Sequence, residues 1–402
     1  MKKLEKSVPI IRFKGFYEAW EQRKLNDIVK LENGYAFKST YFSDVPSKTI
    51  VLTPGNVRIG GGFKNGKGRY YNEISEFPHK FIFQPEDIFV PLTDLTPSAQ
   101  MLGYPAVVPN DGIKYLHNQR LGKLTDFKGD KFFLFQLLST NKYHKYIAAT
   151  AIGTTVKHSS IQKILQYDTS FPSFEEQKNI GIFFKQLDHT IALHQRKLDA
   201  LKLMKKAFLQ QMFPNSEEKV PRLRFVNFDE EWEQRMLNEI ANRYDNLRVP
   251  ITASARISGT TPYYGANGIQ DYVEGFTHDG EFILVAEDGA NDVKNYPVQY
   301  VNGKIWVNNH AHVLQAKENK HDNKFLMNAI KMLKIEPFLV GGGRAKLNSD
   351  VMMTLIVKLP CYEEQKKIGT FLQRLDNAIT LHKNKINKLS SLKKTYLQNM
   401  FI

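Results

Sequence analysis

The chain has 402 residues, of which 42% are hydrophobic and 24% charged, a composition typical of a globular protein with room for two or more domains. The formal net charge of +15 suits a polyanionic partner such as nucleic acid, although a merely basic globular protein fits it equally well. The single cysteine, Cys361, excludes an internal disulfide and a cysteine-based zinc cluster. No apolar run is long enough for a signal peptide or a membrane span, and we therefore expect a cytoplasmic protein.

The chain is an internal tandem repeat. Its opening segment, "IRFKGFYEAWEQRKLNDI" (11–28), matches "LRFVNFDEEWEQRMLNEI" (223–240). A second segment, "EEQKNIGIFFKQLD" (175–188), matches "EEQKKIGTFLQRLD" (363–376). Each half therefore runs from a short opening segment, through a long variable stretch, to a segment that both halves share. Two copies are too few for a solenoid, so the pattern predicts a duplicated protein with two lobes.

The variable stretches, 29–171 and 241–359, predict mixtures of short strands, glycine-rich loops and a few helices. In chain order, the first gives a strand at 48–54, a loop at 58–71, a strand at 80–92 and a helix at 130–147. The second gives strands at 281–288 and 303–315, a helix at 323–334 and a loop at 338–349. We expect one shared fold for the two stretches, although their sequences differ.

The shared segments predict two long helices, over 173–213 and 361–402. Apolar side chains recur in both at alternating steps of four and three, the heptad pattern of a coiled coil. The seam residues of the first helix are Ile180, Phe184, Leu187, Ile191, Leu198 and Leu201; those of the second are Ile368, Leu372, Leu375, Ile379, Ile386 and Leu389. We expect the helices to pack antiparallel, an arrangement that places the two variable stretches at opposite ends.

Polar residues interrupt both stripes at matching places. His194 and Lys205 in the first helix correspond to His382 and Lys393 in the second. Polar residues in a coiled-coil seam can set the register of the two helices. The alternative, that the lysine stems lie along the edge of the seam with their amines in solvent, fits equally well.

The search for catalytic motifs finds no convincing active site. "GGGFKNGKGR" offers Gly66-Lys67-Gly68 where a phosphate-binding loop needs Lys-Ser or Lys-Thr. His310 and His312 would point to one face of a strand, but no carboxylate pattern nearby completes a metal site. The acidic segment 286–294 carries a lysine, as nuclease sites do, but acidic turns of this kind are common. We therefore predict neither a catalytic residue nor a metal site.

Taken together, the repeated motifs resemble the specificity subunit of a Type I restriction–modification enzyme. The resemblance is carried by the "FEEQ…LH…LQQMF" helices, the "W..R.L..I" opening segments and "TPYYGANGIQDYV" (261–273), and it covers essentially the whole chain. It implies an α+β fold with a pseudo-two-fold repeat, in which an antiparallel coiled coil sets the spacing between two target-recognition domains. The implied boundaries are 1–171 and 214–359 for the domains, and 172–213 and 360–402 for the helices.

The resemblance also implies what the chain does and with which partners. Each target-recognition domain would read one half of a split, asymmetric sequence in double-stranded DNA. The chain itself would have no catalytic centre and no cofactor. Two methyltransferase subunits, docked partly against the coiled coil, would use S-adenosylmethionine to methylate adenine at N6. Restriction subunits would use ATP and Mg²⁺ for translocation and cleavage.

Candidate DNA contacts are polar residues in predicted loops and at the start of the second variable stretch. They are Lys64, Lys67, Arg69, Asn118, Arg120, Lys157, His158, Tyr263, Tyr264, Asn267, Asn308, Asn309, Arg344, Lys346 and Asn348. Arg and Lys pair with guanine and Asn with adenine in the major groove, and most contacts in such interfaces reach phosphate. Each residue could instead be solvated or cap a turn, and Tyr263 or Tyr264 could belong to the core. Two other functions stay open: a coiled-coil scaffold with two protein-binding lobes, and a nuclease.

Overall fold

The computed structural model describes residues 8–72, 77–215, 217–342 and 345–402, and the chain divides into two compact units. The first unit runs to Leu193 and includes Lys385–Ile402; the second is His194–Asn384. Each unit therefore contains one variable stretch and part of both long helices. This division differs from the four consecutive segments that the sequence predicts, because each long helix begins in one unit and ends in the other.

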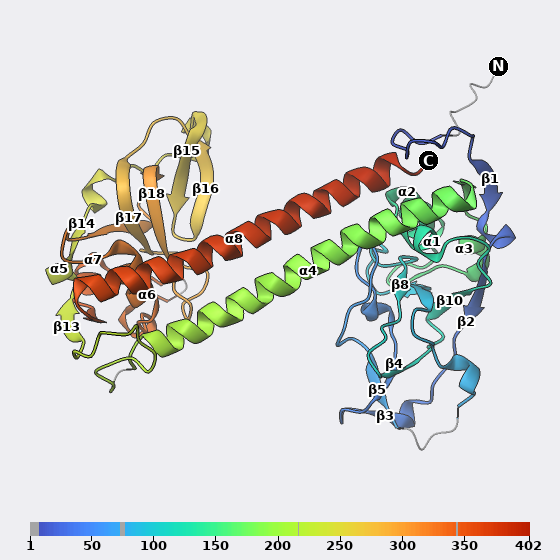
Figure 1. The fold of residues 1–402 in the computed structure, drawn as a ribbon, viewed down its shortest axis with the longest axis horizontal. Helices are drawn as coiled ribbons and strands as arrows, with labels where there is room; N and C mark the ends of the chain where they lie inside the picture. Colours follow the sequence, from blue (N-terminus) through green and yellow to red (C-terminus); the bar gives the residue numbers. More distant parts are fainter. Residues whose placement is uncertain (1–7, 73–76, 216, 343–344) are drawn as a thin grey trace. The chain divides into compact units, whose positions relative to one another are not determined.

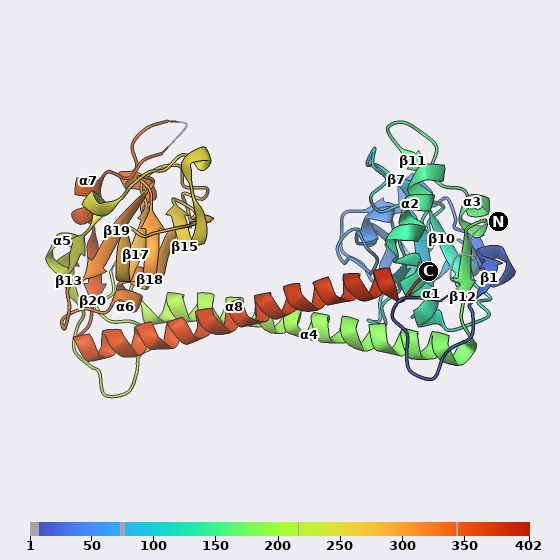
Figure 2. The ribbon, with the colours of Figure 1, turned by 90° about the horizontal axis from the view of Figure 1, so that it is seen from above.

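The two long helices are α4 (Phe174–Met212) and α8 (Tyr362–Asn399). They lie side by side in both views (Figures 1 and 2). Neither sequence contains a proline, and each begins with two glutamates, which the positive end of the helix dipole favours. The predicted coiled-coil helices are thus confirmed, with bounds within three residues of those expected.

In the described part of the first unit, the strands form two four-stranded sheets and two two-stranded ladders. One sheet has the order β2 (Lys30–Asn33), β10 (Leu121–Thr125), β6 (Ile88–Pro91), β8 (Ala106–Val107). The other has the order β3 (Phe42–Ser43), β5 (Arg69–Tyr71), β4 (Thr49–Val51), β9 (Lys114–Leu116). The ladders are β1 (Glu21–Lys24) with β12 (Asp168–Phe171), and β7 (Thr93–Asp94) with β11 (Lys157–His158). Besides single turns of 3-10 helix, the described part of the unit has three short α-helices: α1 (Lys131–Leu138), α2 (Asn141–Thr150) and α3 (Ile161–Leu165).

The described part of the second unit has one larger sheet. Its order is β14 (Ala241–Arg243), β19 (Ala311–Ala316), β17 (His278–Ala286), β18 (Val298–Val307), β15 (Ser258–Gly265), β16 (Gly268–Val273). A ladder joins β13 (Glu233–Met236) to β20 (Ile356–Leu359). The helices are α5 (Leu237–Ile240), α6 (Asn323–Lys331), which packs on β17 and β18, and α7 (Ser349–Met353).

Each core contains a tryptophan from its own opening segment and the last residues of a long helix. In the first unit, Trp20 packs edge-to-face against Phe133 and against Phe401, which follows α8. In the second unit, Trp232 packs against Phe325 and Phe213, which follows α4. The end of each helix therefore completes the core of the other half of the repeat, which explains why "MF" occurs at the end of both helices.

The repeated "EEQ…IG" motif docks each long helix onto its unit. Gln177 donates to the carbonyl of Pro172 and accepts from the backbone N–H of Asp130, the residue that caps α1. A Cβ at Gly181 would lie 2.3 Å from the carboxylate of Asp130, so only glycine allows this approach. The second unit repeats these contacts with Gln365, Pro360, Asp322 and Gly369. The motif thus occurs twice because both docking sites need the same side chains.

A buried ion pair joins each opening segment to the same motif. Arg12 makes two hydrogen bonds to Glu176, at 2.7 and 2.8 Å, and Arg224 makes two to Glu364, both at 2.8 Å. Both glutamates are buried, with at most 1% of the side chain exposed. Each arginine therefore neutralises a carboxylate that would be costly to bury alone.

Candidate nucleic-acid interface

The seam between α4 and α8 is antiparallel, as predicted. In the second unit Lys205 bonds Asp376 at 2.5 Å, and in the first unit Lys393 bonds Asp188 at 2.6 Å. Residues late in one helix thus meet residues early in the other. These lysines pair with carboxylates of the opposite helix, which supports their predicted role in setting the register.

The predicted seam residues are buried or half-buried throughout. Those of α4 are Ile180, Phe184, Leu187, Ile191, Leu198 and Leu201, and those of α8 are Ile368, Leu372, Leu375, Ile379, Ile386 and Leu389. Other apolar residues of the two helices stay exposed, among them Leu203 and Leu381. The heptad interpretation therefore identifies covered positions correctly, but Phe183 and Phe371, outside the stripe, are also half-buried because they pack against the two cores.

In the first unit, a tight turn follows β9. The side-chain Oδ1 of Asn118 accepts a hydrogen bond from the backbone N–H of Arg120 at 2.9 Å. The carbonyl of Arg120 accepts from the N–H of Leu92 at 2.8 Å, which fixes the other side of the turn. The start of the variable stretch runs so close that a Cβ at Gly34 would lie 2.1 Å from the carbonyl oxygen of Asn118. Only glycine fits at this crossing.

The second unit has the same turn between β18 and β19. The side-chain Oδ1 of Asn308 accepts from the backbone N–H of His310 at 2.8 Å, and the carbonyl of His310 accepts from the N–H of Glu287 at 2.9 Å. The N–H of Asn308 donates to the carbonyl of Tyr264 at 3.1 Å. The start of the second variable stretch therefore also lies against its asparagine turn.

The strand register confirms that the two turns are equivalent. In the first unit Leu121 faces Pro91, and in the second Ala311 faces Ala286, one residue after each turn. A further segment pairs beside each turn: His158 with Thr93 in the first unit, and Lys346 with Asp288 in the second. We call 118–120 with 157–158 the first tip, and 308–310 with 345–346 the second tip.

Sequence comparison identifies the family. The sequence profile of the Type I restriction modification DNA specificity domain matches residues 17–203 and 229–391. The chain belongs to this family. It contains two copies of the DNA specificity domain, each spanning one variable stretch and most of a long helix.

Individual relatives agree with this assignment. The chain is 46% identical over 145 residues to a putative Type I restriction enzyme specificity subunit of Haemophilus influenzae; the match covers 36% of this chain and 37% of that protein. It is 25% identical over 197 residues to the MjaVIII specificity subunit of Methanocaldococcus jannaschii, covering 48% and 45%. These matches span less than half the length of the curated relatives.

A solved structure shares the fold across the whole chain. The crystal structure of a Type I restriction–modification S subunit from M. genitalium aligns with a TM-score of 0.74 at 16% identity, covering 98% of this chain and 99% of that one. The predicted fold class is thus confirmed: two mixed α/β domains with two long antiparallel helices.

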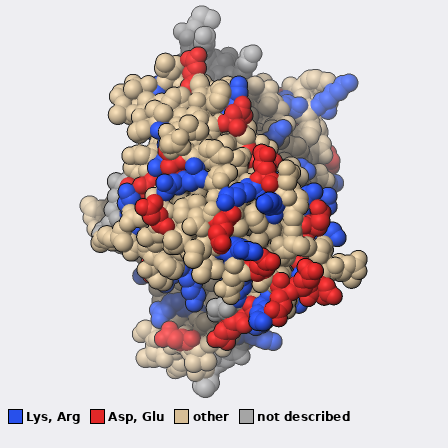
Figure 3. Space-filling model, turned by 90° about the vertical axis from the view of Figure 1, so that its left-hand side faces the viewer, with Lys and Arg blue, Asp and Glu red and all other residues tan. Residues whose placement is uncertain are grey.

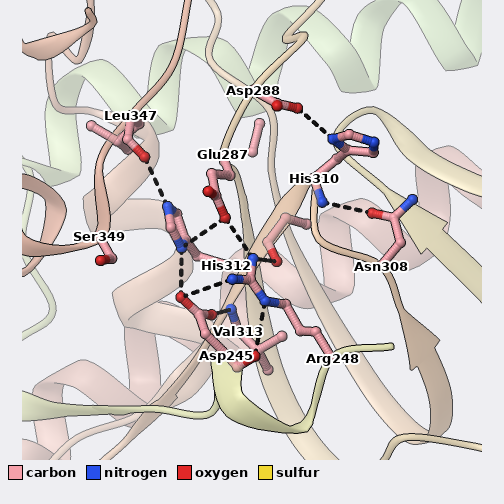
Figure 4. A network of polar contacts seen from close by, with 12 residues as sticks. Asp245, Arg248, Glu287, Asp288, Asn308, His310, His312, Val313, Leu347 and Ser349 are labelled. Atoms are coloured by element: carbon pink, nitrogen blue, oxygen red, sulfur yellow. Dashed lines mark hydrogen bonds and ion pairs between the residues drawn. The ribbon is translucent and has the colours of Figure 1, made fainter. Parts of the chain in front are cut away.

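A network of half-buried charged side chains around the buried His312 supports the tip of the second DNA specificity domain (Figure 4). The imidazole of His312 donates from Nδ1 to the carboxylate of Asp245 at 2.7 Å and from Nε2 to the carbonyl of Leu347 at 2.9 Å. Arg248 donates to Glu287 at 2.6 Å, and Lys346 of the tip pairs with the same carboxylate at 2.9 Å. The network therefore holds the backbone and the amine of one tip segment in place.

The carboxylates of this network are held in their charged form. Burial raises the pKa of Asp245, but the hydrogen bond from His312 and the nearby positive charges outweigh it and leave the pKa below its ordinary value. Burial likewise opposes ionisation of Glu287, and hydrogen bonds from Arg248 and Lys346 lower its pKa overall. By register, the first domain has Gly122 in place of His312. The imidazole at the centre of this network therefore has no counterpart at the matching position of the first domain.

The two neighbouring histidines do not lie as predicted. His310 is in the turn before β19 rather than on the strand, and its Nδ1 bonds Asp288 at 2.5 Å, whereas His312 is buried in the network. They therefore do not share one face. Within the described residues, no group of three or more His, Cys, Asp or Glu side chains is placed to hold a metal ion.

The predicted DNA contacts of the first domain fall in two places. Asn118, Arg120, Lys157 and His158 belong to the first tip, where Arg120 and His158 are exposed. Of the others, Lys64 and Lys67 are exposed in the loop before β5, and Arg69 is exposed at the start of β5. The guanidinium of Arg69 lies 4.0 Å from the ring centre of Phe42.

The predicted contacts of the second domain also divide. Asn308, Asn309 and Lys346 meet in the second tip, but Asn308 is only 4% exposed and serves the turn. Tyr263 is 1% exposed, and its hydroxyl bonds the backbone of Ile251, so the core alternative is correct for this residue.

The remaining predicted contacts lie beside the second tip. Asn267 is exposed and cross-links two loops by bonding the carbonyl of Gly289 and the N–H of Asn291. Tyr264 is half-buried, and Asn348 is exposed at the start of α7. Arg344 lies outside the described residues. The two turns also contain Gln119 and His310, which the sequence did not single out as DNA contacts; the asparagine shared by "HNQR" and "VNNH" is the signal that marks both turns.

Two general findings bear on partners. None of the described helices is long and apolar enough to cross a membrane. Figure 3, which views the molecule from the left-hand side of Figure 1, shows Lys and Arg mixed with Asp and Glu on that face. The net charge of +15 therefore does not form a uniformly basic surface there.

Proposed function

We propose that the chain is the DNA-reading subunit of a Type I restriction–modification complex, in which each DNA specificity domain reads one part of a two-part sequence. One observation carries this proposal: both units build the same asparagine turn and neighbouring strand, but with different exposed side chains. A shared backbone arrangement that carries different exposed side chains suits two DNA-reading sites that prefer different base sequences. The net charge of +15 supports binding to a polyanion.

We further propose that the chain itself is not a catalyst. It would act with methyltransferase subunits that bind S-adenosylmethionine and methylate adenine, and with restriction subunits that use ATP and Mg²⁺. The antiparallel helices α4 and α8 would set the distance between the two parts of the DNA sequence. The covered seam and its matched ion pairs support a fixed register for that role.

The decisive experiment is a selection from random duplex DNA with the purified full chain, alone and together with a methyltransferase subunit of a Type I restriction–modification complex. We expect enrichment of two short sequences separated by a constant number of unspecified bases. Binding should weaken steeply with added salt, because phosphate contacts release counterions. Binding without any enriched sequence, or no binding with either preparation, would refute DNA reading and leave the protein-binding scaffold.

A further inference from the structure

The two tips combine a shared backbone frame with different side chains. At the exposed turn positions the first tip has Gln119 and Arg120, and the second has Asn309 and the part-buried His310. Resting on the proposed function, we propose that these four residues distinguish bases, and that Asn118 and Asn308 are positioning residues.

The positioning role follows from how the asparagines are used. The Oδ1 atoms of Asn118 and Asn308 accept from the backbone N–H two residues later, which closes the turn locally. The carbonyls of Arg120 and His310 are held by the neighbouring strand. Each turn is therefore fixed at both ends, and a side chain on a rigid support discriminates better than one on a mobile loop.

The reading role follows from side-chain chemistry. Gln and Asn form paired hydrogen bonds with adenine, and Arg does so with guanine O6 and N7. The first tip thus offers an amide beside a guanidinium, whereas the second offers an amide beside an imidazole. The two halves of the sequence should differ accordingly, with guanine preferred opposite Arg120.

Neighbouring charges sharpen the difference between the tips. In the second tip His310 bonds Asp288, and Lys346 pairs with Glu287. By register, the first tip has Thr93 and Leu92 at these two acidic positions. The carboxylate-bearing Asp94 lies opposite Lys157 in the first tip. Arg120 and Lys157 thus stand against one carboxylate, whereas Lys346 stands against two, and we infer that the first tip carries more net positive charge. Binding to the half of the DNA sequence that the first tip contacts should therefore weaken more steeply with added salt.

The test compares variants of the full chain in the random-duplex selection. Arg120→Ala should abolish the guanine preference in one half, by roughly five-fold or more, and leave the other half unchanged. Asn309→Ala should alter the opposite half alone. In each variant, unchanged selection of the other half of the DNA sequence shows that the chain still folds and binds DNA. Arg23→Ala is the matched control, because Arg23 is an exposed arginine of the same unit that lies on β1, outside the first tip.

The positioning residue has its own test. Asn118→Ala should blur the preference of the first half, whereas Asn118→Asp, which keeps the accepting oxygen, should retain the preference at lower affinity. If the wild-type chain enriches a two-part sequence but Arg120→Ala changes neither half, or both halves alike, the inference is wrong while DNA reading stands. If the wild-type chain enriches no sequence, both proposals fail.

Discussion

The Nδ1 atoms of His194 and His382 lie 2.9 Å apart in the seam, at matching positions of the two repeats. One of the two Nδ1 atoms must carry a hydrogen and donate it, and the other must accept it. The two histidines therefore differ at Nδ1, although they are equivalent in sequence. Removing one ring leaves the other without this partner in a half-buried seam. The pair thus links the two helices through a single shared proton.

Replacing one of these histidines should cost more than replacing both. We expect His194→Leu to lower the free energy of unfolding by about 1–3 kcal/mol, and His194→Leu with His382→Leu to restore it, because an all-apolar seam leaves no polar group unsatisfied. Urea unfolding measures both. His189→Leu, on the exposed side of α4, is the control and should have little effect. A double variant less stable than either single variant would contradict the prediction.

The buried pair of Arg224 and Glu364 should be essential to the second unit. Arg224→Ala leaves a fully buried carboxylate unpaired and should lower the free energy of unfolding by about 3–5 kcal/mol. Arg222→Ala is the matched control: Arg222 pairs with Glu218 at the surface, and its loss should cost at most about 1 kcal/mol. Equal effects of the two substitutions in thermal or urea unfolding would disprove the assignment.

His117 should make the first unit sensitive to mild acid. Burial lowers the pKa of its imidazole from 6.5 to about 4, and its Nε2 donates to the carbonyl of Leu121. Since the folded pKa lies below the unfolded one, this contribution to stability is complete above pH 6.5 and is lost as the pH falls towards 4. Between pH 6.5 and 5 the loss should be about 2 kcal/mol.

The matched variant is His117→Gln, which keeps a hydrogen-bond donor but does not titrate. Its unfolding free energy should fall less than that of the wild type over the same pH interval. Unfolding curves recorded at several pH values decide the matter. If wild type and variant lose stability in parallel, other groups carry the acid sensitivity.

If α4 and α8 set the spacing of the DNA sequence, lengthening both should lengthen the spacer. Duplicating 191–197 in α4 and 379–385 in α8 adds one heptad to each helix, or about 10 Å, and keeps the seam in phase. At 3.4 Å per base step this corresponds to about three base pairs. The selected sequence should keep its two halves and gain that spacer.

The control for this experiment is the duplication in α4 alone. It prevents the ion pairs Lys205–Asp376 and Lys393–Asp188 from forming at the same time, and we expect lower stability and loss of the two-part preference. An unchanged spacer in the doubly lengthened chain would show that something other than the helices sets the distance.

The repeat and the long helices were predictable from sequence because their signals are local or direct. A heptad stripe is visible within one helix, and "EEQ…IG" is written twice. The partners of that motif, Arg12 and Arg224, also lie in repeated segments, and the recurrence of both residues in each half could have suggested a contact.

The two tips were harder to predict from sequence, because they depend on pairing between strands that are distant along the chain. Nothing near Arg120 indicates that Leu92 holds its carbonyl, and "HNQR" and "VNNH" share only one residue. The strand interpretation of His310 failed because the turn ends one residue before β19 begins. The alternation of apolar and polar residues along the strand likewise could not show that the side chain of Tyr263 is buried.

The aromatic contact between Trp20 and Phe401 has a consequence for biosynthesis. These residues lie at nearly opposite ends of the sequence, yet both belong to the interior of the first unit. On the ribosome that interior stays open until Phe401 has been translated, whereas the last buried residue of the second core, Leu372, emerges earlier. The lobe that is translated first is therefore the one whose folding must wait longest.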